Sequence, residues 1–89
     1  MRIDYSNKFL KKFAKVPLSV RKAFQTRLDI FTTNPNHPLL RNHALIGKYE
    51  GYRSINVTGD WRAIFEECDD LLSPSKYFID IGTHSQLYR

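Results

Sequence analysis

Residues 52–68, YRSINVTGDWRAIFEEC, contain two strand-like segments separated by the polar sequence TGD at residues 58–60. Segments 52–57 and 61–68 are rich in β-branched and aromatic residues, which favour strands, and TGD is typical of a tight turn. A third strand is predicted over residues 76–81, KYFIDI, after the polar segment DDLLSPS at 69–75. The sequence therefore predicts a three-strand antiparallel meander.

The N-terminal part of the chain predicts a strand followed by two helices. Residues 1–6, MRIDYS, alternate in polarity, as a short strand does. Residues 7–16 and 18–33 carry apolar residues at helical spacing, with Pro17 between them and Asn34-Pro35 after them. The stripe of the second helix consists of Val20, Phe24, Leu28 and Phe31. The order predicts an α+β fold, with the antiparallel helix pair on one face of a single sheet and the other face free as a working surface.

Length and composition restrict the class of protein. The 89 residues suffice for one small domain, residues 1–89, and 42% hydrophobic content fits a folded globule. No apolar run approaches the roughly 20 residues of a membrane span, no segment resembles a signal peptide, and Cys68 is the single cysteine. We therefore expect a cytosolic protein that does not enter a membrane.

The charge is unevenly distributed along the chain. The net charge is +5, and eight of the 14 Lys and Arg residues lie in residues 1–33, with two of the nine acidic residues. Such a surplus attracts phosphate polymers or an acidic protein partner. The ordinary alternative is a solvated, lysine-rich helix face.

Three histidines, at positions 37, 43 and 84, are candidates for metal binding or for catalysis. A zinc site usually includes a closely spaced pair of ligands, which this sequence lacks, so no metal and no cofactor is expected. A Ser/His/Asp hydrolase would need a nucleophile-elbow motif, which is also absent. Metal-independent RNA cleavage fits better, because it needs a base for the 2′-OH, an acid for the leaving 5′ oxygen and cations for the phosphate.

Candidate groups for this reaction lie in the irregular segment 34–51, at the TGD turn and in the tail GTHSQLYR at residues 82–89. Histidine suits the acid and base roles, and arginine suits the phosphate. The candidates are His43, Arg53, Asp60, Trp61, Arg62, His84 and Tyr88, the two aromatic residues also being able to stack on unpaired bases. Each also has an ordinary explanation, since Asp60 is a good turn former and Trp61 a good core residue.

Taken together, these segments resemble the RelE/ParE toxin superfamily and in particular its YafQ-like branch. The resemblance covers nearly the whole chain and is carried by His43-x-Leu45-x-Gly47, Gly51-Tyr52-Arg53, Asp60-Trp61-Arg62, Gly82-Thr83-His84 and Leu87-Tyr88. It implies a RelE-like, microbial-ribonuclease-like fold and a type II toxin that cuts mRNA in the ribosomal A site. It also implies neutralisation by a cognate antitoxin, in a higher-order hetero-oligomer.

The resemblance also implies roles for individual residues. His43, Asp60 and His84 match acid–base positions, and Tyr88 matches an aromatic position of the cleft where the branch has Phe. Arg53 and Arg62 match basic positions used on the phosphate. Which group is base and which is acid stays open. Further RNA contacts are expected from Trp61, Lys48, Arg89 and, on the first helix facing ribosomal RNA, Lys11 and Lys12.

Two positions depart from the branch and keep alternatives open. Asn56 stands where the branch has a further active-site histidine, and Asp80 stands near an arginine position, so Asp80 is expected to orient His84 or Arg62 instead. The main alternative function is a ParE-like DNA gyrase inhibitor that cuts no RNA. A nuclease-inactive RNA-binding or antitoxin-binding domain is the second.

Overall fold

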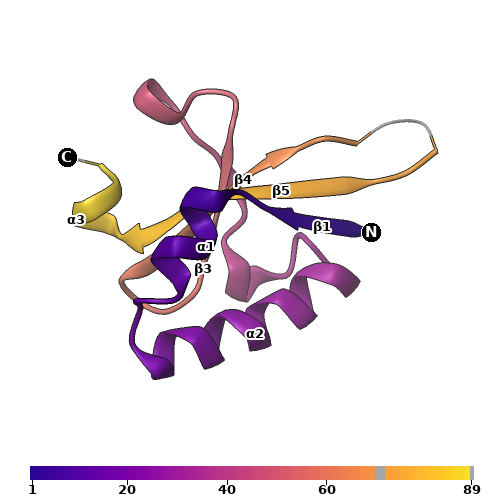
Figure 1. Ribbon diagram of the computed structural model, residues 1–89. Helices are drawn as coiled ribbons and strands as arrows, with labels where there is room; N and C mark the ends of the chain where they lie inside the picture. Colours follow the sequence, from indigo (N-terminus) through magenta and orange to yellow (C-terminus); the bar gives the residue numbers. More distant parts are fainter. Residues whose placement is uncertain (70–71, 89) are drawn as a thin grey trace.

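The computed structural model describes residues 1–69 and 72–88. The predicted order of strands and helices is confirmed, and a short strand, a C-terminal helix and two 3-10 turns are added to it (Figure 1). The elements are β1 (Arg2–Tyr5), α1 (Asn7–Phe13), α2 (Leu18–Thr33), η1 (Pro38–Leu40), β2 (His43–Ala44), η2 (Gly47–Tyr49), β3 (Arg53–Asn56), β4 (Trp61–Glu67), β5 (Ser75–Thr83) and α3 (His84–Leu87). The expected turn at 69–75 includes residues 70 and 71, which lie outside the described residues.

The strands form one mixed sheet in the order β1-β5-β4-β3-β2. β3, β4 and β5 are antiparallel neighbours, which confirms the predicted meander. β1 adds to the far side of β5 in parallel, from the pair Arg2–Ser75 to the pair Tyr5–Phe78. β5 therefore lies between the first strand of the chain and the hairpin.

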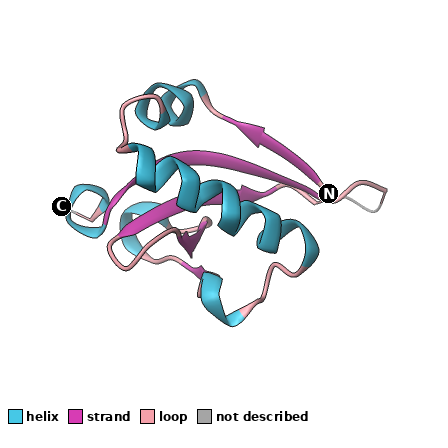
Figure 2. Ribbon diagram, turned by 90° about the horizontal axis from the view of Figure 1, so that it is seen from below, coloured by secondary structure: helices cyan, strands magenta, loops and turns pink. Residues whose placement is uncertain are grey.

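Helices α1 and α2 cover one face of the sheet, and Figure 2 shows α2 lying across the strands. Ser6 caps α1 by accepting from the Phe9 N–H (2.9 Å). The core beneath the helices is aromatic: the ring of Phe24 packs edge-on against Phe78 with centroids 5.4 Å apart, and Phe31 against Phe65 at 5.0 Å. No helix in the described residues is long and apolar enough to cross a bilayer.

The second face of the sheet is partly covered, which the sequence pattern did not indicate. A smaller apolar cluster on this face joins Ile64 of β4 to side chains from the 34–51 segment and from α3. Its buried members are Leu45, Tyr49, Ile64 and Leu87. The segment 34–51 and the tail therefore pack on the sheet, and the surface left between them is smaller than a whole open face.

Asp80 of β5 joins α1 to this second face. It lies opposite Ile64 in the β4–β5 pairing and is 2% exposed. Its carboxylate accepts from Lys12 Nζ (2.5 Å) and Tyr49 Oη (3.2 Å) and pairs with Lys8 Nζ at 3.1 Å. Burial alone would raise the pKa of Asp80, but the two lysines outweigh burial and hold that pKa below its usual value.

Asp80 was expected to orient His84 or Arg62. The described hydrogen bonds and ion pairs of its side chain are instead with the two lysines, with Tyr49 and with the backbone N–H of Ile81. β1 ends at Tyr5 and leaves part of the β5 edge unpaired. Because α1 begins beside that part of the edge, the two lysines lie within reach of Asp80.

Replacing Asp80 with Asn should lower the free energy of unfolding by about 2 kcal/mol at pH 7, because hydrogen bonds to charged groups contribute on that order. The pKa of Asp80 is held below its usual value in the fold, so its contribution is complete above the unfolded-state pKa of about 4 and is lost as the pH falls through the lowered pKa. The difference between the unmodified protein and the variant should therefore shrink in acid. Urea unfolding between pH 2.5 and 7 measures it.

The matched control is Asp4→Asn, which removes an exposed pair with Arg2 (2.9 Å) and should change the free energy of unfolding by less than about 1 kcal/mol. Equal losses in Asp80→Asn and Asp4→Asn would contradict the role assigned to the buried carboxylate.

Candidate active site

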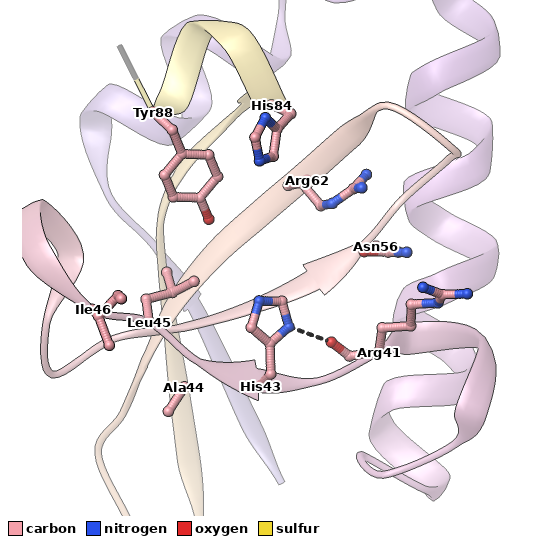
Figure 3. Close-up of a pocket in the computed structure, with 9 residues that line it drawn as sticks. All are labelled: Arg41, His43, Ala44, Leu45, Ile46, Asn56, Arg62, His84 and Tyr88. Carbon is pink, nitrogen blue, oxygen red and sulfur yellow. Dashed lines mark hydrogen bonds between the residues drawn. The ribbon is translucent and has the colours of Figure 1, made fainter.

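A pocket with a cavity volume of about 610 Å³ opens on the second face of the sheet (Figure 3). Its walls come from β2 and the residues on either side of it, from the ends of β3 and β4, and from α3 with the residue after it. The lining residues are Arg41, His43, Ala44, Leu45, Ile46, Asn56, Arg62, His84 and Tyr88. Two are arginine, two are histidine and none is acidic, so the pocket suits an anion.

His43 is exposed in β2, and its ring is held by one hydrogen bond to the backbone. Nδ1 lies 2.7 Å from the carbonyl oxygen of Arg41. A carbonyl oxygen can only accept, so Nδ1 carries the proton and Nε2 of the neutral ring keeps its lone pair. His37 is the opposite case, because its Nδ1 accepts from the Leu39 N–H (3.1 Å) at the start of η1. His43 therefore presents Nε2 as a proton acceptor.

His84 begins α3, the short helix that follows β5 directly, and Tyr88 is the residue just after that helix. Thr83 and Gln86 form a capping box at its start, with both hydrogen bonds present. The rings of His84 and Tyr88 are in contact, with centroids 4.8 Å apart. Leu87, 1% exposed, fixes the helix to the second apolar cluster. Two residues of the predicted tail, His84 and Tyr88, thus form a wall of the pocket.

Tyr49 supports Tyr88 from behind. The two rings meet edge-on with centroids 5.9 Å apart. Burial and the nearby Asp80 carboxylate raise the pKa of Tyr49 to about 12, so its phenol stays protonated and donates to Asp80. Asp80 is thereby linked to the pocket wall indirectly, because it binds Tyr49 and Tyr49 packs against Tyr88.

Arg62 lies at the start of β4, opposite Asn56 in the β3–β4 pairing. Its Nη1 is within hydrogen-bonding distance of the carbonyl oxygens of Thr58 (3.2 Å), Gly59 (3.1 Å) and Trp61 (3.2 Å). These turn carbonyls hold the guanidinium through one nitrogen. Its Nε and Nη2 have no partner among the described residues and can reach a bound anion.

Arg53 does not line the pocket. Its guanidinium donates to the side-chain oxygen of Asn42 from Nε (2.8 Å) and to the Asn42 carbonyl from Nη2 (3.5 Å). It also lies 3.6 Å from a carboxylate oxygen of Glu67. Arg53 therefore holds the segment before His43 in place, and its expected contact with phosphate has no direct geometric support.

Asp60 and Trp61 also lie outside the pocket lining. Asp60 is exposed at the turn, and its carbonyl accepts from the backbone N–H of His84 (3.0 Å), so it touches the site through its main chain. Trp61 packs against the main core and lines a second, smaller pocket with Lys12. Asp60 therefore lies where a turn former is expected and Trp61 where a core residue is expected, which are the ordinary explanations that the sequence offered.

The remaining candidate cations are distributed around the fold. Lys48 lies over the ring of Tyr49, with Nζ 5.2 Å from the centroid. Lys11 is exposed on α1, whereas the ammonium group of Lys12 is bound to Asp80. Arg89 lies outside the described residues. The pocket thus brings together His43, Arg62, His84 and Tyr88 from the predicted set.

The whole chain, residues 1–89, matches the family model described as bacterial toxin of type II toxin–antitoxin system, YafQ. The chain belongs to this family. The resemblance on which the sequence analysis relied is therefore confirmed, and so is the coarse function of a type II toxin. Among curated protein sequences, none matches this chain at a significant level.

Solved structures agree with the family. YafQ from E. coli strain BL21(DE3) superposes with a TM-score of 0.74 at 25% sequence identity, over 100% of both chains. A chain of the E. coli DinJ–YafQ complex superposes with a TM-score of 0.67 at 28% identity, again over 100% of both. A YoeB/ParE toxin from Agrobacterium tumefaciens matches with a TM-score of 0.76 at 14% identity, covering 94% of this chain and 99% of that one, and shows the fold alone.

Sequence reasoning about this toxin missed Arg41, Ala44 and Ile46 among the pocket residues. Arg41 adopts a positive φ of 47°, a conformation favoured by glycine, so its residue type gave no signal. Ile46 is 88% exposed, which is unusual for a large apolar residue, but its exposure becomes visible only once the loop is placed.

The arrangement offers two imidazoles, a phenol and two guanidinium groups around one cavity. Imidazoles can exchange protons near neutral pH, and guanidinium groups can bind phosphate through paired N–H groups. Within residues 1–69 and 72–88, no group of three or more His, Cys, Asp or Glu side chains is placed to hold a metal ion.

Replacing Leu87 with Ala should lower the free energy of unfolding by about 2–4 kcal/mol, the usual cost of such a cavity. It should also loosen α3, since Leu87 is its buried residue. Urea unfolding measures the first effect, and amide hydrogen exchange at residues 84–88 measures the second.

Ser85→Ala, at an exposed position of the same helix, is the control and should leave both measurements nearly unchanged. Unaltered exchange in Leu87→Ala would mean that α3 is held by other contacts.

Proposed function

We propose that this toxin is a ribosome-dependent mRNA endoribonuclease that uses metal-independent acid–base catalysis. The observation that supports this most directly is the pocket itself, in which His43, His84, Tyr88 and Arg62 face one cavity without a lining carboxylate. An RNA phosphate is an anion whose cleavage needs one base, one acid and at least one cation. The lining residues offer all three.

In the proposed reaction, His43 Nε2 takes the proton of the 2′-OH at the cleaved nucleotide. The 2′ oxygen then attacks the adjacent phosphorus, and the bond from phosphorus to the 5′ oxygen breaks. His84, assisted by Tyr88, gives a proton to the departing 5′ oxygen, and Arg62 binds the phosphate oxygens as their charge grows. The products are a 2′,3′-cyclic phosphate and a 5′-hydroxyl end.

Asp60 and Asp80 have supporting roles in this proposal. The Asp60 carbonyl, which accepts from the His84 N–H, fixes the first residue of α3. Asp80 keeps Tyr49 beneath Tyr88. Asn56 contributes a neutral hydrogen-bonding group, which cannot transfer a proton near pH 7.

The proposed partners are the ribosome and an antitoxin, both in the cytoplasm. Exposed lysines of α1 suit ribosomal RNA, with Lys11 carrying more of the contact than Lys12, whose charge is compensated by Asp80. Binding should weaken steeply with salt. An antitoxin partner is supported by the solved DinJ–YafQ complex, whose toxin chain aligns with all of this chain.

Addition of the protein to a translating extract should produce mRNA fragments with 5′-hydroxyl ends, and only when ribosomes engage the message. His43→Ala and His84→Ala should each lower cleavage at least about a hundredfold, the usual contribution of one acid or base. Mapping of fragment ends measures cleavage, and a message with a 2′-deoxynucleotide at the cut site should resist it.

His37→Ala is the matched control, because His37 is a histidine of the neighbouring loop that does not line the pocket. It should cut mRNA as the unmodified protein does. Intact mRNA together with inhibited supercoiling would favour the gyrase alternative. Intact mRNA with normal supercoiling would reject both functions.

A further inference from the structure

Arg41 is a charged pocket residue for which neither sequence nor family motif suggested a role. It follows η1, its side chain is exposed into the pocket, and no described residue forms a hydrogen bond or ion pair with its guanidinium. Figure 3 shows Arg41, Asn56 and Arg62 along one side of the cavity, and the rings of His43, His84 and Tyr88 on the other. The pocket therefore contains, besides Arg62, a second cation without an acidic partner among the described residues. Arg53, which lies outside the pocket, does not supply this cation.

The backbone of Arg41 is left-handed, with φ 47° and ψ 46°. This conformation costs an ordinary residue on the order of 1 kcal/mol, so the neighbours must hold it in place. On one side Leu40 is fully buried in the main core. On the other, Asn42 is bound by Arg53 and donates to the Pro35 carbonyl (3.0 Å).

The left-handed conformation of Arg41 determines the position of its own backbone carbonyl group. The Arg41 C=O accepts from His43 Nδ1, two residues later, at 2.7 Å. The same bond keeps the imidazole oriented and leaves Nε2 unprotonated in the neutral ring. Strained backbone of this kind is often found where a functional group must be placed accurately.

We propose that Arg41 is a functional residue of this site: its guanidinium contacts the RNA phosphate from the side opposite His43, together with Arg62, and its left-handed backbone sets the tautomer that makes His43 the base. The proposal rests on the ribonuclease function proposed above. It differs from the pattern implied by the family motifs, in which Arg53 shares the phosphate with Arg62. Here Arg53 acts through Asn42, as a positioning residue for the Arg41–His43 segment.

The phosphate contact can be tested without ribosomes or cleavage. The probe is a single-stranded RNA carrying 2′-O-methyl groups at every nucleotide, which cannot be cut by 2′-OH attack, titrated at several salt concentrations. Arg41→Gln should weaken binding about fivefold to tenfold at low salt, and should reduce the slope of log K against log salt by about 0.7, the value of one phosphate contact on a single strand. Arg41→Lys should retain most of the binding.

Lys22→Gln is the matched control, because it removes the same charge from an exposed position on α2, outside the pocket. It should leave the slope unchanged. An unchanged slope in Arg41→Gln, an equal loss in Lys22→Gln, or no detectable binding of this RNA by the unmodified protein would overturn the phosphate contact.

The tautomer can be read directly by nitrogen-15 NMR of the imidazole rings. At a pH where the rings are neutral, His43 should carry its proton on Nδ1, and His37, which accepts at Nδ1, should carry it on Nε2 and serve as the internal reference. A proton on Nε2 of His43 would overturn the positioning role. Because neither measurement involves cleavage, the outcome is separate from that of the ribonuclease assay.

Discussion

The buried Asp80 carboxylate is the interaction on which the second face of the sheet depends. It binds Lys12 and Lys8 of α1 on one side and the Tyr49 hydroxyl on the other, and Tyr49 supports Tyr88. A helix, the central region of the sheet and the wall of the pocket therefore meet at one side chain. The two lysines outweigh the effect of burial on the pKa of Asp80, so the carboxylate stays ionised in the fold.

The cationic and proton-bearing side chains of the pocket lie near water and are held in place by hydrogen bonds to backbone atoms. The turn carbonyls bind Arg62, the Arg41 carbonyl binds His43, and the Asp60 carbonyl binds the first residue of α3. Carbonyl groups orient cationic and proton-bearing side chains without adding a negative charge. The cavity thus has two arginines and no lining carboxylate to offset their charge, which suits the RNA phosphate proposed as its ligand.

Periodicity and turn chemistry predicted the meander, α2 and the order of the elements, because these depend on local patterns. The stripe including Phe24 and Phe31 is buried as expected. Of the residues singled out by the family motifs, His43, Arg62, His84 and Tyr88 line one pocket, and their catalytic roles stay a prediction. What could not be predicted depends on contacts distant in sequence: Asp80 reaches lysines 68 or more positions away, and Arg53 is turned toward Asn42. The left-handed Arg41 has no signature in its residue type.

The parallel pairing of β1 with β5 has a consequence for the folding of this protein. Ser6, just after β1, bonds the Ile79 carbonyl of β5, 73 positions further along the chain. Closing so long a loop is entropically costly, and structures rich in such contacts fold slowly. Because His84 and Tyr88 follow β5 directly, the candidate site can form only after β5 has joined the sheet.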